Sequence, residues 1–201
     1  GAAPLRMKLS SAIVGEQAGP FEHAIDARWL MAYSAGVGET DPRYYDTGRG
    51  VLAHPLFPVC YEWPAAQPLR ALPALKPLFP QLLHGQHDLT IHPPARAGDE
   101  LRVPGRIVAV VQRKPGAFVV FRFEARDAKG EQVSTSDFGA LYRGVTVEGG
   151  DRGREPIRSR TAVGIGEGQD GATRGRDTGV ARGIGAWRRF VVPGYALRVP
   201  G

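Results

Sequence analysis

The chain has 201 residues and a mass of 21.6 kDa, which is room for one ordinary domain with an appendage and excludes a large multidomain protein. Apolar residues make up 42% and charged residues 23% of the sequence. A largely folded protein is therefore expected, and no stretch is apolar over the roughly 18 residues that a membrane helix needs. A single cysteine, Cys60, cannot form an internal disulfide. We predict a cytoplasmic protein with no membrane partner.

The net charge of +6 is concentrated in the last quarter of the chain. Residues 151–201 contain ten arginines, no lysine and five acidic residues, so the first 150 residues are close to neutral. A basic protein often binds nucleic acid. Because the body of this chain is nearly neutral, we expect no nucleic-acid partner for it.

A change in composition near residue 150 predicts a domain of residues 8–150 followed by an Arg/Gly-rich tail of residues 151–201. The tail has too few apolar residues to offset the entropy of ordering, so we expect it to be disordered or poorly packed. Three interpretations stay open: a linker remnant, an RNA-binding segment, or out-of-frame sequence. We favour a linker that runs into out-of-frame sequence, because all four lysines precede residue 130. RNA-binding tails interleave aromatic residues, which here come only after residue 186.

Two helices are predicted in the first half of the domain. Asp26 is a suitable N-cap, and apolar residues at helical spacing follow it as far as the glycines at 36–38. Residues 39–46 contain an Asp-Pro step and are expected to form an exposed loop. A buried helix begins at Pro58, where proline suits the first turn, and Pro64 leaves its end open.

From His84 onward the apolar pattern changes to alternation, which predicts strands at residues 87–91, 101–112, 118–126 and 132–143. Turns are expected at 96–99, 114–116 and 128–130. In the second strand we predict Ile107, Ala109 and Val111 on one face. Helices followed by a meander of strands indicate an α+β domain in which an antiparallel sheet wraps around a central apolar helix.

Several segments together resemble the N-terminal domain of MaoC-like dehydratases, which have the hot-dog fold and are related to R-specific, type 2 enoyl-CoA hydratases. The resemblance extends over about residues 8–150. It implies a single hot-dog domain and a role in fatty acid metabolism. The matching segments are Tyr33-Ser34-Ala35-Gly36-Val37-Gly38, the loop 39–46, Ala53-His54-Pro55-Leu56-Phe57-Pro58, His84-Gly85-Gln86, Gly98-Asp99 and Leu141-Tyr142-Arg143-Gly144.

The resemblance also identifies a departure from the catalytic motif. Active members of the family carry Asp-x-Asn-Pro-x-His, whose carboxylate and imidazole hold the water that adds to a 2-enoyl thioester. Amides near the start of the central helix polarise the thioester carbonyl in those enzymes. Here Glu39 stands at the Asp position, Asp41 at the Asn position and Tyr44 at the His position. A tyrosine, whose ordinary pKa is about 10, is a poor general base, so we assign no secure catalytic residue.

Two-hot-dog hydratases of this kind resemble a duplicated gene in which only the second half keeps the catalytic pair, and this chain resembles the first half. The resemblance implies a non-catalytic, acyl-binding half of a lyase that acts on 2-enoyl-CoA and 3-hydroxyacyl-CoA thioesters. The implied partners are an acyl-CoA or acyl-carrier thioester and a second hot-dog domain or subunit in a homo- or heterodimer. Candidate substrate-binding residues are Asp41, Tyr44, His54, Phe57 and Tyr61.

Two other functions stay open. One is a thioesterase, a chemistry that hot-dog folds also host, run by Glu39 alone or with His54. The other is a non-enzymatic assembly partner whose Arg-rich tail contacts nucleic acid. We predict no cofactor and no metal site, since no Cys pair is present and no His-x-x-x-His occurs on the expected helices. His84 and His87 are three residues apart in a strand, so alternation predicts that they face opposite sides.

Overall fold

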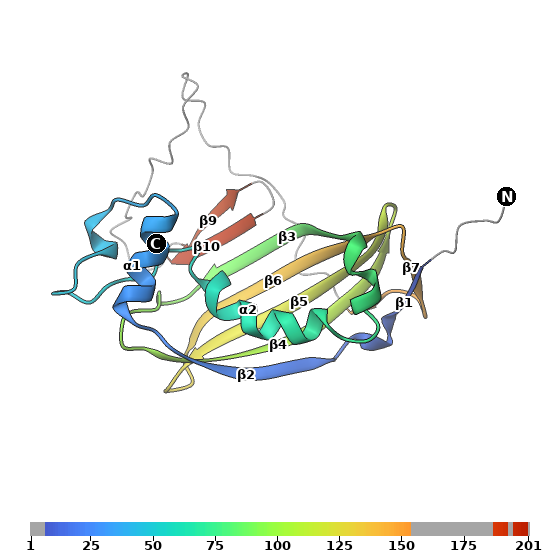
Figure 1. Cartoon of the computed structure of the whole chain (residues 1–201), viewed down its shortest axis with the longest axis horizontal. Coiled ribbons are helices and arrows are strands. Elements are labelled where there is room, and N and C mark those ends of the chain that lie inside the picture. Colours follow the sequence, from blue (N-terminus) through green and yellow to red (C-terminus); the bar gives the residue numbers. More distant parts are fainter. Residues whose placement is uncertain (1–6, 154–186, 193–194, 201) are drawn as a thin grey trace, which may run out of the picture.

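The fold is an antiparallel sheet wrapped around one helix, as Figure 1 shows for the computed structural model. The structure describes residues 7–153, 187–192 and 195–200. Five long strands lie in the order β2–β4–β5–β6–β3, and each pairs antiparallel with its neighbours. This arrangement confirms the predicted α+β hot-dog fold. The strands are β2 (Gln17–Ala24), β3 (Leu82–Ile91), β4 (Glu100–Arg113), β5 (Gly116–Asp127) and β6 (Gln132–Arg143).

Two helices occur where the sequence predicts them. The first, α1 (Ala27–Gly36), begins after Asp26, whose carboxylate accepts a hydrogen bond of 2.7 Å from the Trp29 amide. The second, α2 (Pro58–Arg70), continues through two internal prolines. Because each proline removes one backbone hydrogen bond, packing against the sheet must supply much of the stability of α2.

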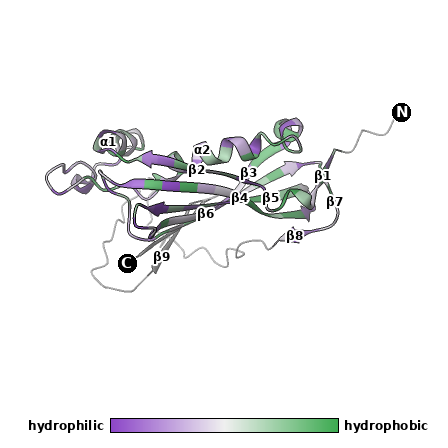
Figure 2. Cartoon of the chain, turned by 90° about the horizontal axis from the view of Figure 1, so that it is seen from below, coloured by the Kyte–Doolittle hydropathy of each residue, from purple (hydrophilic) through white to green (hydrophobic). Residues whose placement is uncertain are grey.

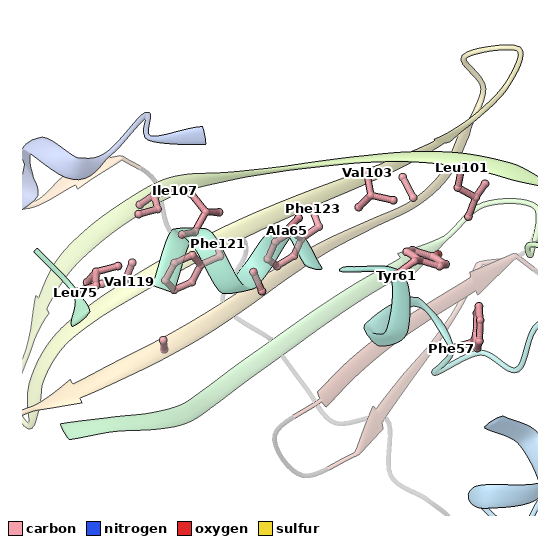
Figure 3. Packing of buried hydrophobic residues seen from close by; sticks show 14 of the residues in the cluster. Phe57, Tyr61, Ala65, Leu75, Leu101, Val103, Ile107, Val119, Phe121 and Phe123 are labelled. Carbon is pink, nitrogen blue, oxygen red and sulfur yellow. The ribbon is translucent and has the colours of Figure 1, made fainter. Parts of the chain in front are cut away.

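The main core lies between α2 and the concave face of the sheet. Figure 3 shows Ala65 of α2 together with Phe121 and Phe123 of β5, and all three side chains are buried. Seen edge-on in Figure 2, α2 covers one side of the sheet, and bands of hydrophilic and hydrophobic residues alternate along the strands. Phe121 and Phe123 both face α2, because alternation along a strand sends every second side chain to the same side of the sheet.

Several short elements lie outside the two helices and the five long strands. At one end of the sheet, β1 (Lys8–Ser10) pairs parallel with β7 (Thr146–Glu148), and β8 (Arg152–Gly153) pairs with β4. Three 3-10 helices span Ser11–Ile13, Pro42–Tyr44 and Lys76–Gln81.

In the tail, β9 (Trp187–Val192) and β10 (Tyr195–Pro200) form a hairpin, and β10 pairs parallel with β3. The sequence predicts neither of these two strands. Residues 154–186 lie outside the described residues, and the predicted boundary near residue 150 stays a prediction.

A β-bulge in β4 changes the predicted faces of that strand. The register with β5 shifts between Ile107 and Ala109, so Val108 is an extra residue. Beyond the bulge the alternation is inverted. Ile107 packs in the main core, whereas Ala109 and Val111 belong to a separate apolar cluster. The prediction that these three residues share one face was wrong for this reason.

A second bulge lies in β3, where the register with β6 shifts between His84 and Gln86 and makes Gly85 the extra residue. The bulge cancels one step of the alternation, so His84 and His87 face the same side of the sheet. Their ring centroids are 5.9 Å apart. The predicted separation of these two histidines onto opposite faces was therefore wrong.

Within the described residues, none of the helices combines the length and the apolar character needed to span a membrane.

Candidate functional site

Three residues singled out in the sequence, Glu39, Tyr44 and His54, lie together in the segments that precede α2. A distance of 3.8 Å separates Glu39 Oε2 from His54 Nε2, and the ring centroids of Tyr44 and His54 are 5.5 Å apart. His54 Nδ1 accepts a hydrogen bond of 3.2 Å from the Leu56 amide, so the neutral imidazole carries its proton on Nε2, toward Glu39. Burial lowers the pKa of His54, and the Glu39 carboxylate opposes this shift.

The carboxylate of Glu39 accepts hydrogen bonds from backbone amides of its own loop. Its Oε1 atom accepts hydrogen bonds of 2.7 Å from the Thr40 amide and 2.9 Å from the Asp41 amide. Asp41 in turn caps the 3-10 helix at the Arg43 amide and forms an ion pair of 2.6 Å with the Arg43 guanidinium. Hydrogen bonds from Arg43 lower the pKa of Asp41. Both acidic side chains thus have structural partners in the loop.

Tyr44 stands at the motif position of the imidazole and is buried, with 3% of its surface exposed. Burial raises its pKa above the ordinary value of 10.0, so its phenol stays protonated at neutral pH and does not accept a proton from water. The structure brings Glu39 and Tyr44 to one place, as the motif implies, but the motif's His position holds a buried phenol instead of an imidazole.

Two further predicted substrate-binding residues lie in the core. Phe57 and Tyr61 are at most 1% exposed, and their ring centroids are 5.9 Å apart in an edge-to-face contact. The Tyr61 hydroxyl pairs with the Ser134 hydroxyl at 2.8 Å, and burial raises its pKa. Neither side chain lines the cavity described next, and direct contact of either with a substrate stays a prediction.

A cavity of about 400 Å³ lies along α2 between the helix and the strands β3, β5 and β6. At its edge the side chains of Trp63 and Phe79 are about half exposed, and the Arg70 guanidinium lies 4.9 Å from the centroid of each ring. Pockets that take small molecules are mostly apolar with a few placed polar groups, and this cavity fits that description. Its apolar walls are Val59, Ala66, Leu82, Phe123 and Phe138.

The polar residues of the cavity include a buried pair that sequence reasoning missed. Glu62 on α2 and His87 on β3 face each other at 3.6 Å between Oε2 and Nε2, and both side chains are less than a tenth exposed. His84 lines the same cavity, and its pKa is lowered by burial and by His87. One signal was available: Glu62 is the single acidic residue of α2, whose sequence is otherwise mostly apolar and rich in proline.

Cys60 directly follows the lining residue Val59 in sequence, but it does not itself line the cavity. Burial, reinforced by the Glu62 carboxylate, raises the pKa of the thiol to about 11. A thiol is nucleophilic as the thiolate, so Cys60 is almost entirely in its unreactive form at neutral pH. Cys60 is partly buried and packs against the main core.

We predict that the domain loses stability as the pH falls through about 6.5. Burial lowers the pKa of four histidines below the ordinary value of 6.5, so at that pH the unfolded chain binds more protons than the folded one. The stability is complete above this range and declines below it. Thermal melting between about pH 7.5 and pH 5.5 should show a falling Tm, and His54→Gln should flatten the curve. A Tm independent of pH would contradict the prediction.

Sequence comparison identifies the family. The family model of the FAS1-like dehydratase domain region matches residues 12–136, more than half of the chain. A UPF0336 protein of Streptomyces coelicolor is 26% identical over 138 residues, which cover 65% of this chain and 92% of that protein. A UPF0336 protein of Streptomyces griseus is 28% identical over 138 residues, with the same coverage of both chains.

Solved structures show the same fold at low sequence identity. A MaoC-like dehydratase from Phytophthora capsici superposes with a TM-score of 0.60 and 23% identity over 74% of this chain, which spans 54% of that protein. The HadBC (3R-hydroxyacyl-ACP dehydratase) complex from Mycobacterium tuberculosis gives a TM-score of 0.56 and 18% identity, covering 64% of this chain and 96% of that one. The chain belongs to the FAS1-like dehydratase family, and it has the fold of the MaoC-like dehydratase structure.

Proposed function

We propose that this chain is the acyl-binding, non-catalytic half of a two-hot-dog hydratase or dehydratase that acts on 2-enoyl-CoA and 3-hydroxyacyl-CoA thioesters. The observation that carries the proposal is the loop at the motif position, where Tyr44 replaces the imidazole and is buried. A buried phenol with a raised pKa does not activate water at neutral pH. Catalysis then has to come from a second hot-dog unit.

The start of α2 supports the same conclusion. In active relatives, amides at this point stabilise the thioester oxygen. Here Pro58 has no amide hydrogen, and the Cys60 amide donates a hydrogen bond of 2.8 Å to the Phe57 carbonyl. The Val59 amide points to the Leu56 carbonyl at 3.4 Å. An oxyanion needs hydrogen-bond donors that point at it. The Val59 and Cys60 amides instead point to backbone carbonyl groups of this chain.

The cavity along α2 supports binding of the acyl chain. Its volume of about 400 Å³ and its apolar walls suit a hydrocarbon segment, and burial of such a segment is favourable by about 0.8 kcal/mol for each methylene. We infer that the thioester end stays outside the cavity, nearer the loop of residues 39–46, while the chain extends between α2 and the sheet.

A second hot-dog unit is consistent with two of the related structures. The Phytophthora capsici dehydratase is about twice as long as the part that this chain matches, and the mycobacterial dehydratase is a complex of subunits. These are properties of those proteins. For this chain we propose a partner hot-dog unit that carries an intact Asp-x-Asn-Pro-x-His loop.

Purified alone, the protein should not hydrate crotonyl-CoA or a longer 2-enoyl-CoA above the rate in buffer, because its own loop lacks the proton-transferring imidazole. The decrease in enoyl-thioester absorbance measures this rate. A MaoC-like hydratase with an intact motif, assayed in parallel, shows that the substrate and conditions are suitable. Appreciable turnover by this chain alone would overturn the non-catalytic assignment.

Filling the cavity should weaken binding of long acyl chains. Ala66→Leu adds three carbons at a buried lining position, and overpacking of this kind costs about 1–3 kcal/mol, which corresponds to a loss of about 5-fold to 150-fold in affinity. Calorimetry should show this loss for dodecanoyl-CoA and little change for crotonyl-CoA. Ala32→Leu, on an exposed position of α1, is the matched control and should change neither affinity. Equal losses for both thioesters would indicate a general disturbance of the fold.

A thioesterase is the second candidate, and the distance of 3.8 Å between Glu39 and His54 is the observation that favours it. Such an enzyme would release free thiol from an acyl-CoA, and Glu39→Gln would abolish the release. We rank it second because Glu39 Oε1 is held by two loop amides and His54 Nδ1 by the Leu56 amide. Since Nδ1 accepts this hydrogen bond and Nε2 carries the proton, the neutral imidazole has no free nitrogen lone pair with which to act as a base.

A further inference from the structure

We propose that the cavity along α2 selects an acyl chain that carries a hydroxyl group far from the thioester, in addition to the 3-hydroxyl of the proposed substrates, and that Glu62 and His87 hold this distant hydroxyl. The inference rests on the proposed function in one respect, namely that an acyl chain enters this cavity. It goes further because it assigns a polar substituent to the chain and two residues that recognise it.

The carboxylate of Glu62 is buried without a hydrogen-bond partner among the described residues. Its side chain is 4% exposed, and neither of its oxygens makes a hydrogen bond within the part of the chain that the structure describes. Burying a carboxylate without such partners costs several kcal/mol even when a charged neighbour is close. An apolar side chain at this position of α2 would avoid that cost. The fold therefore keeps two hydrogen-bond acceptors at a cavity wall, where a ligand can supply the donor.

His87 on β3 lies opposite Glu62 across the cavity. Its Nε2 atom lies 3.6 Å from Glu62 Oε2, and both residues line the cavity. The bulge at Gly85 brings His84 to the same wall, 5.9 Å from the His87 ring. Glu62 and His87 therefore form one polar site between the apolar walls, with one member on α2 and the other on β3.

The charged and polar residues that line the cavity favour a neutral ligand group over a charged one. An ammonium group would pair with Glu62 but would meet the Arg70 guanidinium and two imidazoles in the same cavity. A carboxylate would be attracted by Arg70 and repelled by Glu62. A neutral hydroxyl donates to a carboxylate oxygen and can accept from an imidazole N–H, so it supplies the donor that Glu62 lacks without adding charge. The apolar walls require that the rest of the ligand be hydrocarbon.

The experiment measures binding of two matched series of acyl-CoA thioesters to the full chain by isothermal titration calorimetry. One series is unsubstituted, with six, eight, ten and twelve carbons, and the other carries a terminal hydroxyl at each length. Changing the length moves the hydroxyl along the cavity. We expect one length at which the hydroxyl raises affinity about tenfold, the typical gain from a hydrogen bond to a charged group. A terminal amine at that length should bind more weakly than the hydroxyl.

Variants test whether Glu62 is the origin of the preference. Glu62→Leu should reverse it, so that the unsubstituted chain binds more tightly, and should leave Tm unchanged or raise it because the cost of burying a carboxylate without hydrogen-bond partners is removed. Glu124→Leu makes the same substitution on the outer face of the sheet and should not change the preference. The comparison of the two ligand series on the unaltered chain stands even if a variant does not fold.

The outcomes separate this inference from the proposed function. If unsubstituted chains bind and the hydroxyl gives no gain at any length, the hydroxyl site is wrong and the acyl cavity survives. If no thioester binds in either series, both proposals fail. A tighter complex with the amine, or a large fall in Tm for Glu62→Leu, would also overturn the inference, because Glu62 would then be a cation site or a structural residue.

Discussion

Replacing Phe121 with alanine is expected to lower the free energy of unfolding by about 3–5 kcal/mol. The side chain is completely buried in β5, in register with Ile107 on β4 and Phe138 on β6. Its ring centroid lies 5.7 Å from that of Phe138, and Figure 3 shows Phe121 beside α2. Truncation removes the transfer energy of the ring and leaves a cavity that the paired strands cannot close.

Urea denaturation followed by circular dichroism measures the change. Leu83→Ala is the control, because Leu83 is 46% exposed and its truncation should cost no more than about 0.5 kcal/mol. The total stability of a typical domain is about 5–15 kcal/mol. Phe121→Ala should therefore clearly lower the urea concentration at which half of the protein is unfolded. If the two variants behave alike, the sheet does not enclose a core at Phe121.

The second large effect is expected on the outer face of the sheet, at the ion pair between Arg122 and Asp137. The two residues lie opposite each other on β5 and β6, and the guanidinium donates two hydrogen bonds of 2.7 and 2.8 Å to the carboxylate. Arg122→Met leaves Asp137 buried and unpaired, with Asp88 in register beside it on β3. Losing one member of a buried pair costs about 3–5 kcal/mol. We expect about 3 kcal/mol, because the Arg122 side chain is 31% exposed.

A double variant provides the internal check. Arg122→Met combined with Asp137→Leu removes both charges and should recover most of the lost stability, since apolar pairs of similar volume replace buried ion pairs at little cost. The four-way cycle of unfolding free energies isolates the pair energy. If the double variant is as unstable as Arg122→Met alone, the loss comes from packing of the arginine stem rather than from the unpaired carboxylate.

The regular parts of the fold could be predicted because their sequences agree with one periodicity. The strand expected at residues 132–143 is β6 (Gln132–Arg143), and Asp26 caps α1 as its side-chain type predicts. The strand β2 was missed because Gly19 and Pro20 indicate a turn. Pro20 is tolerated in β2 because this strand lies at the end of the strand order, beside an irregular register with β4.

The candidate site was predictable only in part. The family motif placed Glu39 and Tyr44 on one loop, and the structure brings His54 to them. The cavity pair was missed because Glu62 and His87 are 25 positions apart in sequence and meet only through packing of α2 on β3. No local pattern records such a contact. A lone carboxylate in an apolar helix was the one available signal, and it did not indicate which residue would lie opposite.

The extra residue in β3 has a consequence for how this family varies. Side-chain alternation makes every insertion or deletion of one residue in a strand exchange the inner and outer sets beyond it. A relative without a counterpart of Gly85 would keep both histidine codons and yet turn one imidazole away from the hollow beside α2. The length of one strand, rather than the identity of its residues, would then set the polarity of the ligand that the protein accepts.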